Sequence, residues 1–262
     1  MKKRILSILA VIIVCISCFA PTNVFAGTDS LLNLKLITKG YPTQLLNILE
    51  KEQKEDLLDN ECCYESSKAY YYDNNGNLID CISFDKDSVS TIGQIKDAHL
   101  ALLITASKTK KGETKISFDY IWKTLPVNRY QDPIYITWDN SVFSLKTDSF
   151  NKVDMFTYVL GDGSNGKIYT STHSNENSFA DATFGYLSWY ADLKGYTANV
   201  IRLFGYGSFT LTPKKKNVST QIFGKYVHDK SALGVSLSFA NGSVSISGSQ
   251  YDEKSTSTDI KS

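Results

Sequence analysis

The fold is decided by residues 235–247, which read VSLSFANGSVSIS. Asn241-Gly242 is a strong signal for a two-residue hairpin turn, because both residues tolerate the positive φ angles that such turns require. The turn places Phe239 opposite Val244, so that apolar side chains share one face of the hairpin and serines share the other. This segment therefore predicts an antiparallel hairpin with one register.

A second hairpin is expected around Asn75-Gly76. The run AYYYD at residues 69–73 meets LIDCI at residues 78–82 across this polar turn. The register that follows places Cys81 opposite Tyr70. The polar residues of the turn suit tight-turn geometry, and their spacing does not complete a calcium-binding loop.

Segments of similar character follow along most of the chain. They are short, rich in β-branched and aromatic residues and separated by turn signals, which is typical of an antiparallel sandwich or barrel. The expected strands are residues 100–107, 116–122, 134–138, 142–146, 156–160, 167–172, 183–193, 198–204, 208–212 and 220–227. The predicted fold class is all-β: an antiparallel β-sandwich, or a barrel-like variant, of about ten or more strands with a small helical N-terminal segment.

The chain divides into four predicted parts. Residues 1–26 form a signal peptide, and residues 27–60 form one or two short helices that pack on the sheet, with Pro42 at a first helical position. Residues 61–252 form the β-sandwich domain. Residues 253–262 (EKSTSTDIKS) lack periodicity and are expected to be a disordered tail.

The N-terminus has the order of a secretion signal. Basic residues 2–4 precede an apolar stretch at residues 5–20, and Val24-Phe25-Ala26 forms a small-x-small cleavage site. An uncleaved anchor is the alternative, but about 16 apolar residues ending at Pro21 fall short of the roughly 20 that span a bilayer. We expect export and cleavage near Ala26, and an extracellular protein.

Cleavage also changes the charge. It leaves 25 Lys and Arg against 27 Asp and Glu, a weakly acidic balance that favours neither nucleic acid nor anionic lipid as a partner. The longest apolar run after cleavage, residues 100–106, is too short to cross a membrane. Three cysteines remain, namely Cys62, Cys63 and Cys81, and we expect buried thiols, because the predicted hairpin holds Cys81 too far from Cys63 for a disulfide.

Motifs for catalysis and for metals are missing from the sequence. There is no G-x-S-x-G segment for a serine hydrolase, and His99, His173 and His228 lie more than fifty residues apart instead of at the short spacings of zinc ligands. The sequence therefore predicts a protein that is not an enzyme and holds no cofactor or metal. Acidic residues that the fold brings together would leave an extracellular hydrolase as an alternative.

The best candidate site is an aromatic patch. The chain has 16 Tyr, 13 Phe and 3 Trp, and the residues proposed for a binding surface are Tyr186, Trp189, Tyr190 and Tyr196. Exposed rings of this kind stack on sugars or contact proteins. Packing between sheets is the competing interpretation. Because side chains alternate along a strand, Tyr186 and Tyr190 share a face with Phe184, whereas Trp189 points the other way.

Two resemblances bear on function. The hairpin arms at residues 233–239 and 243–249 resemble the membrane-inserting hairpins of β-pore-forming toxins, although each arm has about seven residues where spanning strands need about 9–11. The segment at residues 226–230 (YVHDK) is similar to small secreted β-sandwich bacteriocins.

The layout as a whole resembles uncharacterised secreted proteins of Gram-positive spore-forming bacteria. The residues that carry this resemblance are the MKKR start, Lys39-Gly40-Tyr41-Pro42, the Tyr-rich hairpin and Ala191-Asp192-Leu193-Lys194-Gly195-Tyr196. The resemblance implies export and no particular activity. We therefore expect a secreted, non-catalytic β-sandwich that binds a glycan or protein at the cell envelope, with a pore-forming or bacteriocin-like toxin as the alternative.

Overall fold

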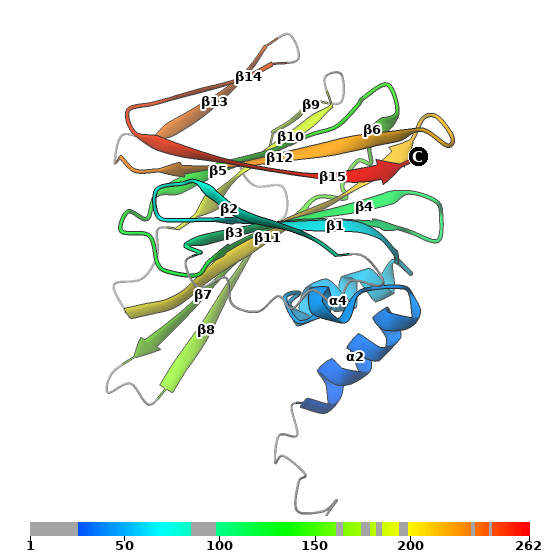
Figure 1. Ribbon diagram of the computed structural model, residues 1–262, viewed down its shortest axis with the longest axis horizontal. Coiled ribbons are helices and arrows are strands. Elements are labelled where there is room, and N and C mark those ends of the chain that lie inside the picture. Colours follow the sequence, from blue (N-terminus) through cyan, green and yellow to red (C-terminus); the bar gives the residue numbers. More distant parts are fainter. Residues whose placement is uncertain are drawn as a thin grey trace, which may run out of the picture.

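The computed structural model describes residues 26–84, 98–160, 165–173, 179–181, 185–193, 199–231, 234–240 and 243–262. Two antiparallel sheets are stacked, and a layer of helices lies on the outer side of the larger sheet (Figure 1). The predicted all-β antiparallel sandwich is confirmed. Within the described part of the chain, every helix is too short or too polar to span a membrane.

The larger sheet has eight strands in the order β2-β1-β3-β4-β11-β7-β8, and β6 also pairs with β11. The strand bounds are β1 Cys63–Tyr72, β2 Leu78–Ser83, β3 Leu100–Lys108, β4 Thr114–Trp122, β6 Phe143–Leu145, β7 Asn151–Leu160, β8 Asn165–His173 and β11 Asn199–Pro213. Every pair is antiparallel.

The smaller sheet has five strands in the order β15-β12-β5-β10-β9. Their bounds are β5 Gln131–Thr137, β9 Phe179–Asp181, β10 Tyr186–Asp192, β12 Ser219–Asp229 and β15 Tyr251–Lys261. A separate two-stranded sheet pairs β13 (Val235–Ala240) with β14 (Ser243–Gly248).

The main hydrophobic core lies between the two large sheets. Strand β3 shows why its sequence is continuously apolar: Leu102 and Ile104 point into this core, whereas Ala101 and Leu103 point to the helical layer. A strand covered on both faces needs apolar residues at every position rather than at alternate ones.

Three helices cover the other face of the larger sheet. They are α2 (Ala26–Thr38), α3 (Thr43–Leu46) and α4 (Lys51–Asp59). Helix α4 begins with a capping box, in which the Glu50 N–H donates to the Gln53 side chain at 2.9 Å. Pro42 is the N-cap of α3 rather than its first helical residue. Leu45, Leu46 and other leucines of this layer pack against β1 and β3.

Strand β11 corrects one expectation. The sequence predicts two strands at residues 198–204 and 208–212, but residues 199–213 form one continuous strand of 15 residues, and residue 198 lies outside the described residues. Gly207 makes no turn here: a Cβ on it would lie 2.6 Å from Cζ2 of Trp189. The glycine lets the indole of Trp189 lie directly on the strand backbone, which is a packing role that the sequence does not distinguish from a turn signal.

Strand β15 overturns the prediction of a disordered C-terminal tail. In the expected disordered tail at residues 253–262, residues 253–261 pair with β12. Its inward positions are Lys254, Thr256, Thr258 and Ile260, all buried. Three of these four are polar, so alternation of apolar residues does not mark the strand. It meets the edge of the larger sheet through side-chain contacts, among them the Tyr70 hydroxyl, which donates to the Ser257 carbonyl at 3.0 Å.

The predicted register of the β1–β2 hairpin is confirmed, since Tyr70 lies opposite Cys81. The turn is wider than two residues, however, because the register shifts next to Tyr72. The expectation of buried thiols is correct for Cys62 alone, since Cys63 and Cys81 are exposed and all three cysteines are free. Strand β2 is a sheet edge, so the side chain of Cys81 has no covering layer.

The β13–β14 hairpin also has the predicted register, with Phe239 opposite Val244 and Leu237 opposite Ile246. Each arm has six residues, which is fewer than the roughly 9–11 of a membrane-spanning strand. Val235 packs on Val227 and Tyr135 of the smaller sheet, so the base of the hairpin is attached to the sandwich.

Candidate functional site

The predicted aromatic patch is divided between core and surface. Trp189 is 1% exposed and belongs to the core between the sheets, and Tyr186 is also buried. Tyr190 is partly exposed, and Tyr196 lies outside the described residues. Because β10 alternates, Trp189 points inward while Tyr186 and Tyr190 share the opposite face. The competing interpretation, packing between sheets, therefore holds for Trp189, and no exposed platform forms at Tyr186.

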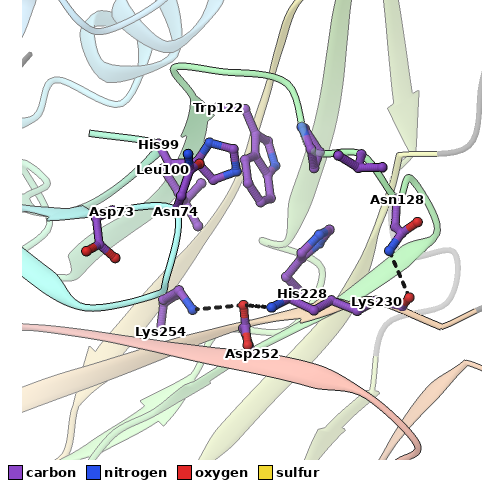
Figure 2. A pocket seen from close by; sticks show the side chains of 12 residues that line it. Asp73, Asn74, His99, Leu100, Trp122, Asn128, His228, Lys230, Asp252 and Lys254 are labelled. Atoms are coloured by element: carbon purple, nitrogen blue, oxygen red, sulfur yellow. Dashed lines mark hydrogen bonds and ion pairs between the residues drawn. The ribbon is translucent and has the colours of Figure 1, made fainter. Parts of the chain in front are cut away.

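A different site opens at one end of the sandwich. It is a cavity of about 290 Å³ between the ends of strands from both sheets and the β1–β2 turn. We call it the end pocket, and it is lined by Asp73, Asn74, His99, Leu100, Trp122, Pro126, Val127, Asn128, His228, Lys230, Asp252 and Lys254. Figure 2 shows the His228 side chain pointing into the cavity toward Trp122, with His99 beside the indole.

Backbone pairing positions the residues of the pocket floor. Leu100, at the start of β3, pairs with Trp122 at the end of β4, so His99 lies beside the indole. On the other sheet, His228 pairs with Asp252 near the end of β12. The two imidazoles therefore come from different sheets and meet at the same indole.

Trp122 contacts both histidines. Its ring centroid lies 5.0 Å from that of His99 and 4.8 Å from that of His228, and both contacts are edge to face. The indole itself is 5% exposed, so it forms an apolar wall rather than an open stacking platform. A ring lodged in the pocket would contact this wall together with Leu100 and Pro126.

A buried carboxylate orients His228. Asp132 on β5 is fully buried and accepts hydrogen bonds from His228 Nδ1 at 2.9 Å, from the Asp229 N–H at 2.9 Å and from the Tyr226 hydroxyl. Burial raises the pKa of Asp132, and these hydrogen bonds oppose the rise. With its proton on Nδ1, His228 keeps Nε2 available to a ligand.

The chain of hydrogen bonds continues behind Asp132. The indole N–H of Trp122 donates to the Tyr226 hydroxyl at 3.2 Å, and that hydroxyl donates to Asp132. The wall of the pocket and the carboxylate behind it are thereby connected, which restricts the movement of both.

Charged groups form the rim. Asp252 lies between two lysines, 2.6 Å from Lys230 Nζ and 3.7 Å from Lys254 Nζ (Figure 2). Near Lys254, Asp73 accepts hydrogen bonds from the Asn77 side chain and backbone, which lower the pKa of Asp73. Asn128 donates to the Lys230 carbonyl at 2.8 Å and fixes the connection that borders the pocket.

The electrostatic setting disfavours the protonated form of His99. Partial burial lowers its pKa, and the nearby positive charges of His228, Lys254 and Lys230 lower it further. Its Nδ1 contacts the Thr124 hydroxyl. His99 is more exposed than His228 and forms the accessible side of the pocket.

The sequence separates His99, His173 and His228 by more than fifty residues each, a spacing that does not predict which of them the fold brings together. The structure brings His99 and His228 together and leaves His173 at the end of β8. Within the described ranges, no group of three or more His, Cys, Asp or Glu could hold a metal ion. The one local signal for the pocket was the alternation along residues 226–230, which places Tyr226 and His228 on the same face of a strand.

Comparison with known proteins gives only weak structural likenesses. A structure described as "BspA_C_mut" has a TM-score of 0.30 and 9% identity over 59% of this chain, and the match spans 55% of that structure, little more than half its length. A "Pore forming protein" has a TM-score of 0.30 and 9% identity, covering 62% of this chain and 86% of its own. The "Streptococcus agalactiae AgI/II polypeptide BspA C terminal domain (WT)" has a TM-score of 0.31 and 8% identity, covering 74% and 80%. No family model and no curated protein matches the chain. Scores at this level carry no inference about ligand or activity.

Proposed function

We propose that this protein is exported and binds a glycan of the cell envelope, with one sugar unit held in the end pocket. The observation that carries the proposal is the pocket itself: an apolar wall of Trp122, Leu100 and Pro126 faced by a rim of carboxylate, amide and ammonium groups. A sugar ring presents apolar C–H faces and a girdle of hydroxyl groups, which this arrangement complements.

The shape of the pocket favours a small ligand over a protein surface. A cavity of about 290 Å³ is close to the lower end of the roughly 300–1,000 Å³ typical of small-molecule sites. Protein partners usually bury about 800 Å² per side on broad surfaces. Export is supported by the basic, apolar and small-x-small order of residues 1–26. The proposed function is binding alone.

A pull-down of the mature chain, residues 27–262, on purified envelope fractions tests this proposal. Asn74 is exposed and lines the pocket, whereas its neighbour Asn75 is exposed and does not. Asn74→Trp should block the pocket and abolish retention on the glycan fraction. Asn75→Trp, a matched control in the same turn, should be retained like the unmodified protein.

Two results would overturn the proposal. One is failure of the unmodified protein to bind any envelope fraction. The other is equal retention of the Asn74→Trp and unmodified proteins, since binding would then occur away from the end pocket. Thermal unfolding of both variants controls for loss of structure, and we expect little change because both positions are exposed turn residues.

A further inference from the structure

The charge of the end pocket depends on its two histidines. Its other ionisable lining groups are two lysines, Lys230 and Lys254, and two carboxylates, Asp73 and Asp252, whose formal charges cancel. Lys254 is almost fully buried and shares Asp252 with Lys230. The lining is therefore neutral while both imidazoles are neutral, and it gains a positive charge with each proton that His99 or His228 takes up.

His228 leaves Nε2 free of the contact with Asp132. Its Nδ1 is 2.9 Å from a carboxylate oxygen of Asp132, which lies outside the lining and behind the ring. A buried carboxylate in this position both fixes the tautomer and stabilises the imidazolium ion. Because Nδ1 faces Asp132, Nε2 is the ring nitrogen left for a polar group of a ligand in the pocket.

His99 is surrounded by positive charge, whereas His228 has the carboxylate of Asp132 beside it. Positive charge on His228, Lys254 and Lys230 disfavours its protonated form. A negative group placed in the cavity would reduce this repulsion, so that binding of an anion and protonation of His99 would favour each other. Asp73 and Asp252 face the same space, but both already interact with donors, Asp73 in its turn and Asp252 with the two lysines.

We propose that the ligand of the end pocket carries an anionic oxygen group, a carboxylate or a phosphate on a sugar, which binds between His99 and His228 together with uptake of a proton. This inference rests on the proposed glycan-binding function and adds the chemical class of the ligand. Asp132 already lies beside His228, so the negative group offsets the positive charges that surround His99, and the lysines add further N–H donors at the rim.

The test uses two sugars that differ in one group. Methyl glucuronoside keeps an ionised carboxylate throughout pH 5.5–8.0, and methyl glucoside has a neutral hydroxymethyl group in its place. Isothermal titration of the mature protein is run at both ends of this range, in two buffers with different ionisation heats. Binding of the glucuronoside should strengthen toward pH 5.5, by about tenfold for each imidazole whose pKa it raises by about one unit. The buffer dependence of the heat should show proton uptake, and the glucoside should show neither effect.

Substitutions show which residues cause the pH dependence of glucuronoside binding. His99→Gln, at a partly exposed position, and Asp132→Asn should each reduce the pH dependence of glucuronoside binding. His173→Gln, at the end of β8 on the outer strand of the larger sheet, is the matched control and should leave the pH dependence unchanged. If burial of Asp132 makes its variant unfold, His99→Gln still decides the question.

The outcomes separate this inference from the proposed function. Equal affinity for the two sugars at both pH values, without proton uptake, would overturn the inference and leave glycan binding intact. Failure of both sugars and of every envelope fraction would overturn both. Glucose 6-phosphate, measured in parallel, distinguishes the two sources of negative charge: tighter binding of the phosphate than of the glucuronoside supports a phosphate-bearing glycan, and the reverse supports a sugar acid.

Discussion

The carboxyl group of Asp119 should make the stability of this protein depend on pH in an unusual direction. Asp119 on β4 points to the helical layer and is 5% exposed. Gln53 Nε2 of helix α4 donates to it at 2.5 Å, and the Ser117 hydroxyl donates at 3.0 Å. Burial raises the pKa of Asp119 from its ordinary 3.8 to about 7, and the charge of Glu50 adds to the rise, while the two hydrogen bonds oppose it.

The sign of the effect follows from the direction of the shift. The folded protein holds this proton more tightly than the unfolded chain, so the stabilising contribution is complete below pH 3.8 and is lost as the pH rises to about 7. A shift of this size corresponds to about 4 kcal/mol in the free energy of unfolding, of which roughly 2.5 kcal/mol is lost between pH 5 and pH 8.

Asp119→Asn removes the ionisation and keeps the shape and most hydrogen-bonding capacity of the side chain. Urea unfolding at pH 5 and at pH 8 measures the free energy of unfolding of both proteins. Relative to the unmodified protein, the variant should be more stable at pH 8 than at pH 5 by about 2.5 kcal/mol. Because every other titrating group is common to both proteins, their difference isolates Asp119. Parallel pH profiles would refute the reasoning, as they would show that Asp119 titrates alike in the folded and unfolded chains.

Three further predictions concern the corrected expectations. Trp189→Ala should cost about 3–5 kcal/mol in unfolding free energy by urea denaturation, because the indole fills the core between the sheets. Deletion of residues 253–262 should abolish cooperative thermal unfolding, followed by circular dichroism, because β12 loses its partner strand. In the folded protein expressed as residues 27–262, a thiol reagent should label Cys63 and Cys81 quickly and Cys62 only after unfolding, since Cys62 is buried and burial raises its pKa to about 12.

Each of these has a control and a contradicting result. Tyr190→Ala, on the partly exposed face of β10, should cost less than the tryptophan substitution, and equal costs would argue against the assigned burial. A cooperative transition in the truncated chain would show that β15 is dispensable. Labelling of all three thiols at one rate would contradict the burial of Cys62.

Local patterns in the sequence were sufficient for hairpins and for fold class. The register of β13–β14 follows from Asn241-Gly242 and from the alternation of Leu and Phe with Ser, all within a dozen residues. Alternation of apolar residues could not predict strand β15, because its inward residues include Lys254, Thr256 and Thr258. Their burial depends on β12 and on the edge strands of the larger sheet, which lie far away in the sequence.

The end pocket was decided by tertiary structure alone. Asp132 and His228 are 96 positions apart and meet because β5 and β12 are neighbours in one sheet. His99 and Trp122 reach the same place from the other sheet. Alternation along one strand determines which side chains share a face, but it contains no information about which strands lie side by side or how two sheets are stacked. The sequence by itself therefore determined strands, turns and fold class, whereas the site exists only where the ends of both sheets come together.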